Sequence, residues 1–294
     1  MKKKKIKEPV IKRDFTEDDM PHNRFQAFWD IVKIRYDVLL KLALIFFITI
    51  FPLIIALFTK NVMLGKLDDA YANGEMNEEG YRSSILQLQC VFIFIEAACI
   101  LIFAIPFSGT IRIYRLLTYY EGIVFSADFR QGIKENLKQV FIVFLVDVLV
   151  FIVSKLSIYY LLSINRNDFL STIIFFLPAF MSIILILPIS ILHIDQVSIY
   201  NNKYFENIKN SFFLYLKSGL VFLPVSILLI APLFLMIIKI LYMPILVLSF
   251  YAIIWLPFII LMIYLIGNSI FDKHINIQQY PSIVDKGVYR KKAK

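Results

Sequence analysis

Six long apolar stretches dominate this chain and restrict what it can fold into. Each runs for about 20 residues, and a helix of that length spans the roughly 30 Å hydrocarbon core of a bilayer. Hydrophobic residues make up 59% of the chain and charged residues only 18%, whereas soluble domains carry about a quarter charged residues. The sequence therefore predicts an all-α fold, a polytopic membrane helix bundle.

The predicted spans fall at about 38–58, 89–111, 139–163, 170–193, 219–238 and 243–266. A turn must separate the last two, because one helix over that whole stretch would be about 73 Å long, more than twice the bilayer core. Lys239 with Pro244 is the expected place for that turn. We expect a single membrane domain over residues 24–267, a basic polar tail before it (1–23) and a basic cytoplasmic tail after it (268–294).

The distribution of basic residues predicts the orientation. Segments 1–41, 112–138, 194–218 and 267–294 carry 25 of the 31 lysines and arginines. The positive-inside rule therefore places these segments, and both termini, in the cytoplasm of a multi-pass protein of the cell membrane. The net charge of +9 is explained by attraction to anionic lipid headgroups, so nucleic acid is not expected as a partner.

Three segments outside the predicted spans have an amphipathic pattern. They cover residues 24–35, 128–141 and 205–216, where aromatic and aliphatic side chains alternate with basic ones. Such a pattern is typical of short helices lying at the membrane interface, or of the cytoplasmic start of the following span. Asp128 is the expected N-cap of the second segment. A docking surface for a cytoplasmic partner, such as an ATPase, is the alternative interpretation.

Three ionisable residues lie inside the predicted spans. Glu96 and Lys155 are expected at the same depth, each about seven residues from the outer end of its helix, so an ion pair between them would lower the cost of burying either one. Asp147 has no obvious partner. These residues either hold helices together, or Glu96 or Asp147 lines a polar pathway or binds a cation.

Catalytic motifs are missing from the sequence. It has no phosphate-binding glycine loop, no H-E-x-x-H, no G-x-S-x-G and no Cys/His cluster. His193 and Asp195 supply too few ligands for a metal site, and an interfacial hydrogen bond is expected for them. We therefore expect no enzyme activity, no cofactor and no metal. Prolines within the spans predict kinks that serve packing, with a hinge as the alternative.

Three stretches carry a resemblance to a known family. They are NRFQAFWDIVKIRYDVLLKLALIFFITIFPLI, PFSGTIRIYRLLTYYEGIVFSADFRQGIKENLKQVF and FENIKNSFFLY, and together they resemble the YesL-like family of bacterial integral membrane proteins over about residues 24–235. The clearest part is the second stretch. The candidate residues for contact with a cytoplasmic partner are Arg112, Arg115, Phe129, Lys134, Asn136, Lys138 and Lys209.

The resemblance implies a role in transport without naming an activity. Some members of the family sit beside carbohydrate-uptake systems in Gram-positive bacteria, which implies an accessory part in solute uptake. We therefore expect a non-catalytic accessory or scaffold subunit that contacts a transporter or another membrane protein. A secondary transporter or channel that uses the intramembrane acidic residues is the alternative, and it requires a polar cavity that reaches the bilayer midplane.

Overall fold

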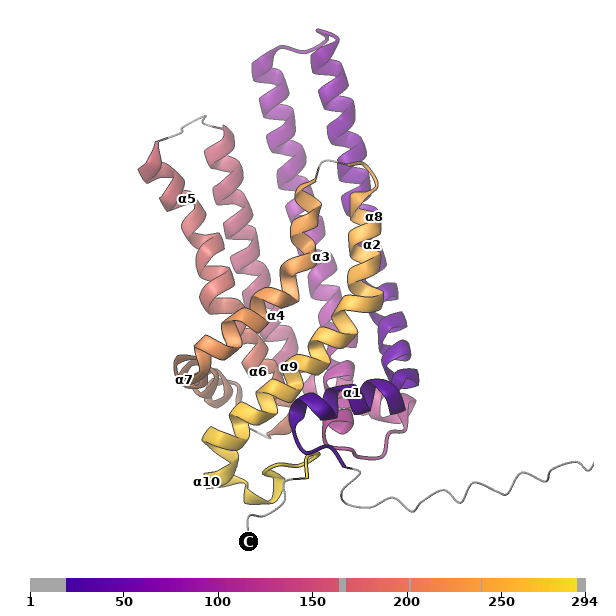
Figure 1. Cartoon of the computed structure of the whole chain (residues 1–294). Helices are drawn as coiled ribbons and strands as arrows, with labels where there is room; N and C mark the ends of the chain where they lie inside the picture. Colours follow the sequence, from indigo (N-terminus) through magenta and orange to yellow (C-terminus); the bar gives the residue numbers. More distant parts are fainter. Residues whose placement is uncertain (1–19, 164–167, 201, 239, 290–294) are drawn as a thin grey trace, which may run out of the picture.

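The protein is a bundle of long helices (Figure 1). The computed structural model describes residues 20–163, 168–200, 202–238 and 240–289. Within these ranges there is no strand, and six helical segments are long and apolar enough to cross a membrane. The all-α polytopic prediction is confirmed. Helix α1 and the last described residues lie at one end of the bundle, here called the terminal end, and the tip of the α2–α3 hairpin lies at the far end (Figure 1).

Each predicted span falls within one of the six helical segments, to within a residue. The first three segments belong to α2 (Tyr36–Ala72), α3 (Glu78–Thr118) and α4 (Phe125–Ser163). The fourth joins α5 (Phe169–Met181) to α6 (Leu187–Ile199), and the fifth is α7 (Tyr204–Ile230) with a 3₁₀ extension to Ile237. The sixth contains α8 (Met243–Phe250), α9 (Leu256–Phe271) and α10 (Ile277–Gln279). The predicted turn before Pro244 is confirmed, while Lys239 lies outside the described residues.

The hairpin of α2 and α3 extends well beyond the predicted spans 38–58 and 89–111, because most of the chain between them is also helical (Figure 1). Gly74, with φ of 76°, ends α2, and the Gly74 and Glu75 amides donate to the carbonyls of Tyr71 and Ala70, as in a Schellman cap. The Asn77 side chain then caps α3 by accepting from the Gly80 amide at 2.8 Å. Both caps are local signals that can be read from the sequence, and they place the end of α2 and the start of α3 beyond the predicted spans.

The three amphipathic segments have two different structures. Helix α1 (Arg24–Ile34) is a separate short helix that lies across the terminal end, with Ala27 and Ile31 in the core (Figure 1). The segments 128–141 and 205–216 are the first turns of α4 and α7. For these two segments, the structure therefore shows the alternative prediction, in which the segment is the start of the following span. Helix α4 begins at Phe125, so Asp128 is not the N-cap; its carboxylate instead accepts from the Val124 amide at 2.7 Å.

The C-terminal boundary predicted at residue 267 differs from the structure. Helix α9 continues to Phe271, a π-helical turn follows, and α10 ends at Gln279. Ile270, Phe271 and Ile275 are buried in the core, and burial of such side chains favours an ordered chain. The Tyr289 amide donates to the Pro21 carbonyl at 2.8 Å. Residues 268–289 are thus part of the bundle rather than a separate tail.

At two of the prolines, a side chain from a neighbouring helix donates to the carbonyl four residues earlier. Pro188 has no N–H to donate to the carbonyl four residues earlier, and the Tyr215 hydroxyl on α7 donates to that Ile184 carbonyl at 2.5 Å. The Leu228 carbonyl, four residues before Pro232, accepts from the Ala231 amide and also from the Trp255 indole at 3.0 Å. These contacts favour the packing interpretation for Pro188 and Pro232, since a side chain from another helix reaches the backbone before each of them.

The core lies among α2, α3, α6, α7 and α9. Tyr114 and Tyr264 stack at its centre with ring centroids 5.6 Å apart, and Phe46, Leu192 and Phe222 are fully buried around them. In contrast, no residue in the most apolar window of the fourth segment is buried inside the protein. Apolar side chains facing outward need no cover when the surrounding solvent is hydrocarbon, as in a bilayer.

Candidate functional site

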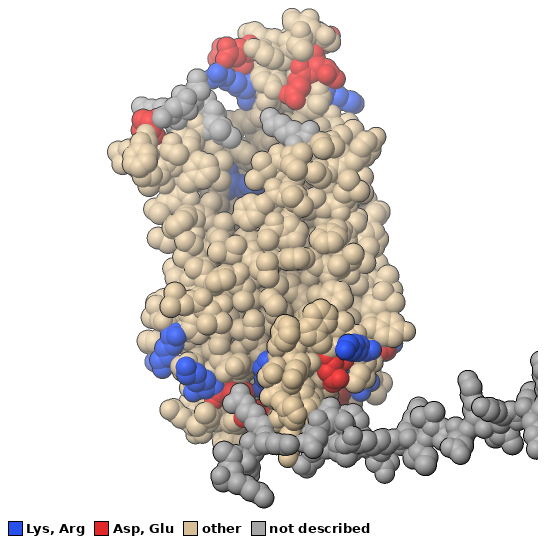
Figure 2. All heavy atoms as spheres, viewed as in Figure 1, with Lys and Arg blue, Asp and Glu red and all other residues tan. Residues whose placement is uncertain are grey.

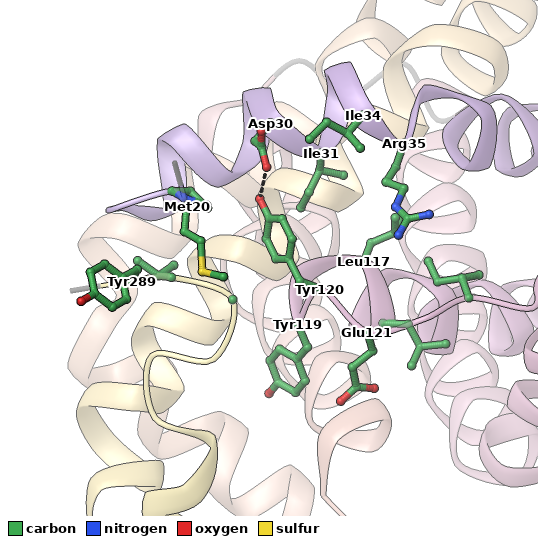
Figure 3. Close-up of a pocket in the computed structure, with 15 residues that line it drawn as sticks. Met20, Asp30, Ile31, Ile34, Arg35, Leu117, Tyr119, Tyr120, Glu121 and Tyr289 are labelled. Atoms are coloured by element: carbon green, nitrogen blue, oxygen red, sulfur yellow. Dashed lines mark hydrogen bonds between the residues drawn. The ribbon is translucent and has the colours of Figure 1, made fainter. Parts of the chain in front are cut away.

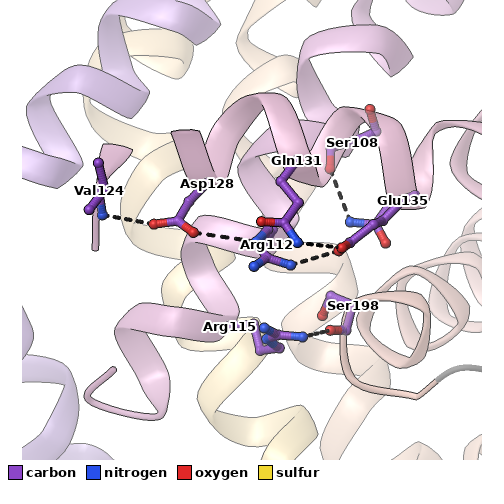
Figure 4. Close-up of polar contacts among 9 residues, drawn as sticks. Ser108, Arg112, Arg115, Val124, Asp128, Gln131, Glu135 and Ser198 are labelled. Carbon is purple, nitrogen blue, oxygen red and sulfur yellow. Dashed lines mark hydrogen bonds and ion pairs between the residues drawn. The ribbon is translucent and has the colours of Figure 1, made fainter. Parts of the chain in front are cut away.

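Arg112, one of the predicted docking residues, is held by acidic side chains of the neighbouring helix (Figure 4). Its Nη1 lies 2.6 Å from Glu135 Oε2, and its Nε lies 3.6 Å from Asp128 Oδ1. Gln131 orients Glu135 by donating to its other carboxylate oxygen at 2.7 Å. The Arg112 side chain is 14% exposed. Its charge is therefore matched within the α3–α4 hairpin.

The two helices of this hairpin approach closely at a pair of glycines. A Cβ on Gly132 would lie 2.9 Å from the Gly109 carbonyl oxygen, and a Cβ on Gly109 would lie 2.7 Å from the Phe129 ring. Small residues permit such close contact between membrane helices. One turn beyond, Asn136 is buried and donates to the Ser108 carbonyl at 3.3 Å. The glycine pair and Asn136 thus stabilise the same close contact between α3 and α4.

The remaining predicted docking residues divide between the interior and the surface. Arg115 donates from Nη1 to the Ser198 carbonyl at 3.0 Å and so joins α3 to α6 (Figure 4). Phe129 is half-buried and stacks on Phe125. The lysines are exposed: Lys134 and Lys138 on α4, and Lys209 on α7. Arg112, Arg115 and Asn136 therefore contact the protein itself, and only the lysines present their charge outward.

Glu96 is paired, but with a different lysine from the one predicted. Its Oε1 lies 2.9 Å from the Lys60 Nζ, and both residues are buried, at 5% and 7% exposed. Lys60 lies just outside the predicted span 38–58, but α2 continues as helix to Ala72 and carries Lys60 alongside α3. The Lys155 Nζ instead lies 5.6 Å from the centroid of the Phe151 ring on its own helix. The Glu96–Lys155 pairing was therefore wrong.

Asp147 has a partner that the sequence did not indicate. The Ser190 hydroxyl on α6 donates to its carboxylate at 2.6 Å. A serine hydroxyl carries no charge and no distinctive pattern, so the only usable signal was its position on the neighbouring predicted span. The contact joins α4 to α6.

His193 and Asp195 are buried rather than interfacial, at 1% and 2% exposed. The His193 ring packs against Tyr204, with centroids 4.8 Å apart. Neither the His193 Nε2 nor the Asp195 Oδ2 has a hydrogen-bond partner among the described residues, so the expected hydrogen bond is not observed there. The Asp195 Oδ2 lies against Gly267, where a Cβ would come within 2.6 Å. Across residues 20–289 as described, no group of three or more metal-binding side chains occurs.

A cavity of about 300 Å³ lies at the terminal end between α1, the end of α3 and the C-terminal segment (Figure 3). Tyr120 crosses it, with φ of 54°, and donates to Asp30 Oδ2 at 2.8 Å. Burial raises the pKa of Tyr119 above its usual value, and burial with the hydrogen bond to Asp30 raises the pKa of Tyr120. Both phenols therefore stay protonated at neutral pH. No pattern in the sequence indicated this cavity, because segments distant in the chain form it.

Residues 286–289, here called the C-terminal segment, lie opposite the tyrosines, and Gly287, Val288 and Tyr289 line the cavity there. Gly287, with φ of 82°, lies against the Thr118 carbonyl, where no Cβ would fit. The Lys286 ammonium donates to Glu121, and the Arg24 guanidinium donates to the Lys286 carbonyl at 2.7 Å. The segment thus fastens α1 to the end of α3.

Fold and charge together define a polytopic helical membrane protein. Its terminal end carries a compact hairpin with exposed lysines and a cavity beside the interfacial helix. Comparison of the chain with protein-family models, curated proteins and solved structures gave no match. The resemblance to the YesL-like family therefore stays a prediction based on the sequence stretches alone.

Proposed function

We propose that this protein is a non-catalytic accessory or scaffold subunit of a solute-uptake system, with carbohydrate as the solute class that the family resemblance implies. In this proposal it resides in the cell membrane and both termini face the cytoplasm. The exposed Lys134, Lys138 and Lys209 form the contact surface for the partner, and anionic headgroups surround it. The partner is a transporter or another membrane protein.

The observation that carries the proposal is the ion pair between Lys60 and Glu96. A transport pathway needs ionisable groups that reach a substrate, whereas these two buried groups neutralise each other at 2.9 Å and join α2 to α3. Lys60 also lies 5.9 Å from the centroid of the Tyr159 ring, which adds α4 to the same cluster. The charges at this depth thus serve helix packing, as a scaffold requires.

Basic residues at the terminal end support the cytoplasmic orientation. Figure 2 shows basic and acidic side chains gathered at the two ends of the visible face, with a largely uncharged band between them. Lys134, Lys138 and Lys209 at the terminal end match the positive-inside rule. The far hairpin carries Asp68, Asp69, Glu75, Glu78 and Glu79. Reporter fusions after residue 289 and at Gly74 should report opposite sides, and the same side for both would contradict the topology.

The proposed role is tested by crosslinking in native membranes followed by purification of the full chain. A transporter component should copurify, and a triple variant, Lys134→Glu, Lys138→Glu and Lys209→Glu, should recover much less of it. Lys66→Glu and Arg82→Glu at the far hairpin are the matched control and should leave recovery unchanged. A protein that purifies alone while vesicles containing it take up solute would refute the scaffold role.

A transporter is the second candidate, and Asp147 is the observation that favours it. Its recorded hydrogen bond comes from an uncharged hydroxyl, and Ser190 follows a π-helical turn over Ser182–Ile186 and the kink at Pro188. Such turns are frequent at functional sites. Asp147→Asn should abolish uptake by reconstituted vesicles if this candidate is correct, with Glu96→Gln assayed beside it. Absence of any uptake by the parent protein would remove the candidate.

A further inference from the structure

A second cavity at the terminal end gathers basic side chains over an apolar floor. It has a volume of about 350 Å³ and lies between α7, the end of α9 and the start of α1. Lys217 on α7, with Lys273 and His274 just after α9, forms its basic part. These three residues are here called the basic cluster. They come from segments more than 50 residues apart in the chain, so the tertiary fold brings them together.

The basic cluster has no counter-ion among the described residues. Lys217, Lys273 and His274 line one cavity, so the two lysine charges and the imidazole lie close together. Asp272, which precedes Lys273 in the chain, is already engaged, because it accepts from Arg24 at 2.8 Å and from Asn276 at 2.7 Å. Like charges held together without a neutralising anion favour an anion bound from outside.

The position of the basic cluster indicates which anion. Lys217 directly precedes the apolar run of the fifth predicted span, and Lys273 follows the end of the sixth. From these positions beside the apolar runs, we expect both lysines at the level where the hydrocarbon layer ends and lipid phosphates begin. Below the charges, the cavity is lined by apolar side chains. They are Val221, Leu265, Ile266 and Ile270.

The apolar lining of the cavity is continuous with apolar side chains on the outer surface of α7. Leu220 is 96% exposed and Val221 is 58% exposed, so an acyl chain leaving the cavity would contact apolar side chains directly. A small inorganic anion would use the charges but gain nothing from this surface, whereas a phospholipid would use both. Basic pockets between membrane helices bind phosphate headgroups in this way.

We propose that the cavity between α7 and α9 is a binding site for an anionic phospholipid, with Lys217, Lys273 and His274 around the phosphate and Val221 against the acyl chain. The site is separate from the lysines of α4 assigned to the partner. It holds a lipid where the fifth and sixth membrane segments contact each other.

The test uses the full chain in neutral detergent, with phosphatidylglycerol as the probe and phosphatidylcholine as the comparison. Bound lipid is counted by native mass spectrometry across a titration. Each lysine near an anionic headgroup contributes about five-fold to affinity. The double variant Lys217→Gln and Lys273→Gln should therefore bind phosphatidylglycerol roughly 30-fold more weakly, and phosphatidylcholine binding should be weak throughout.

The matched control is the double variant Lys66→Gln and Arg82→Gln, which removes the same charge from exposed positions on the far hairpin. It should change affinity by less than about two-fold, since charges away from the headgroup are screened. His274→Gln, a single substitution that leaves both lysines, should give an intermediate loss. Equal losses in both double variants, no preference for phosphatidylglycerol, or displacement of the lipid by millimolar inorganic phosphate would each overturn the proposal.

Discussion

Gly132 tests whether the crossing of α3 and α4 is as close as the structure shows. A methyl group at this position would lie 2.9 Å from the Gly109 carbonyl oxygen and 2.9 Å from Arg112 Cβ. Neither neighbour is the far end of a flexible side chain, so the helices themselves must separate. Separation would also stretch the Arg112–Glu135 contact of 2.6 Å and the Asn136–Ser108 hydrogen bond of 3.3 Å.

Two opposing free energies determine the effect of Gly132→Ala. Overpacking a tight contact costs about 1–3 kcal/mol, while replacing glycine by alanine inside a helix stabilises by about 1 kcal/mol. Gly65 on α2 provides the comparison, because nothing lies within 4 Å of its added Cβ and no overpacking can arise there. Gly65→Ala therefore keeps the helix gain without the clash. The two variants should differ in free energy of unfolding by about 1–3 kcal/mol, with Gly132→Ala the less stable.

The measurement is unfolding in mixed micelles by titration with a denaturing detergent, applied to the parent protein and both variants. Gly109→Ala, whose Cβ would meet the Phe129 ring at 2.7 Å, should behave as Gly132→Ala does. If Gly132→Ala proves as stable as Gly65→Ala, the helices are not in the contact described and the argument from close packing fails.

Two further predictions concern buried polar contacts. Lys60→Met and Glu96→Gln should each lower the free energy of unfolding by about 3–5 kcal/mol, because each leaves one buried charge unpaired. The double variant should recover much of this loss. If the two losses simply add, the ion pair does not exist. Lys155→Met should cost less than Lys60→Met in the same titration. Tyr215→Phe should cost about 1–3 kcal/mol by leaving a buried carbonyl without a donor. In a Pro188→Ala background, where the backbone N–H returns, the same change should cost clearly less, and an equal cost in both backgrounds would contradict the role of the hydroxyl.

Hydropathy was sufficient to predict the spans because each depends on a local property. An apolar run of the right length forms a helix in a bilayer whatever its neighbours are, since its backbone must satisfy its own hydrogen bonds. The turn between the fifth and sixth segments followed from length alone. The helical caps at Gly74 and Asn77 were equally local signals, and attention to them would have predicted the long α2–α3 hairpin.

The partners of the buried charges were not predictable in the same way. Matched depth on adjacent spans suggested Lys155 for Glu96, but depth does not fix rotation about a helix axis, and α2 proved to continue as helix through Lys60. The sequence motif around Arg112 and Asn136 was predicted to contact a cytoplasmic partner, and in the structure both residues join α3 to α4. Arg112 does not present its charge to a partner, because Asp128 and Glu135 in the same motif, on the facing helix α4, neutralise it.

The sequence by itself determined that six helices of this chain belong in hydrocarbon, because span length and apolar character are properties of each segment alone. Only the tertiary structure decided which charges meet, which carbonyl freed by proline finds a donor, and which basic side chains gather around one cavity. Those outcomes depend on the rotation, tilt and spacing of helices, and many distant contacts set these together.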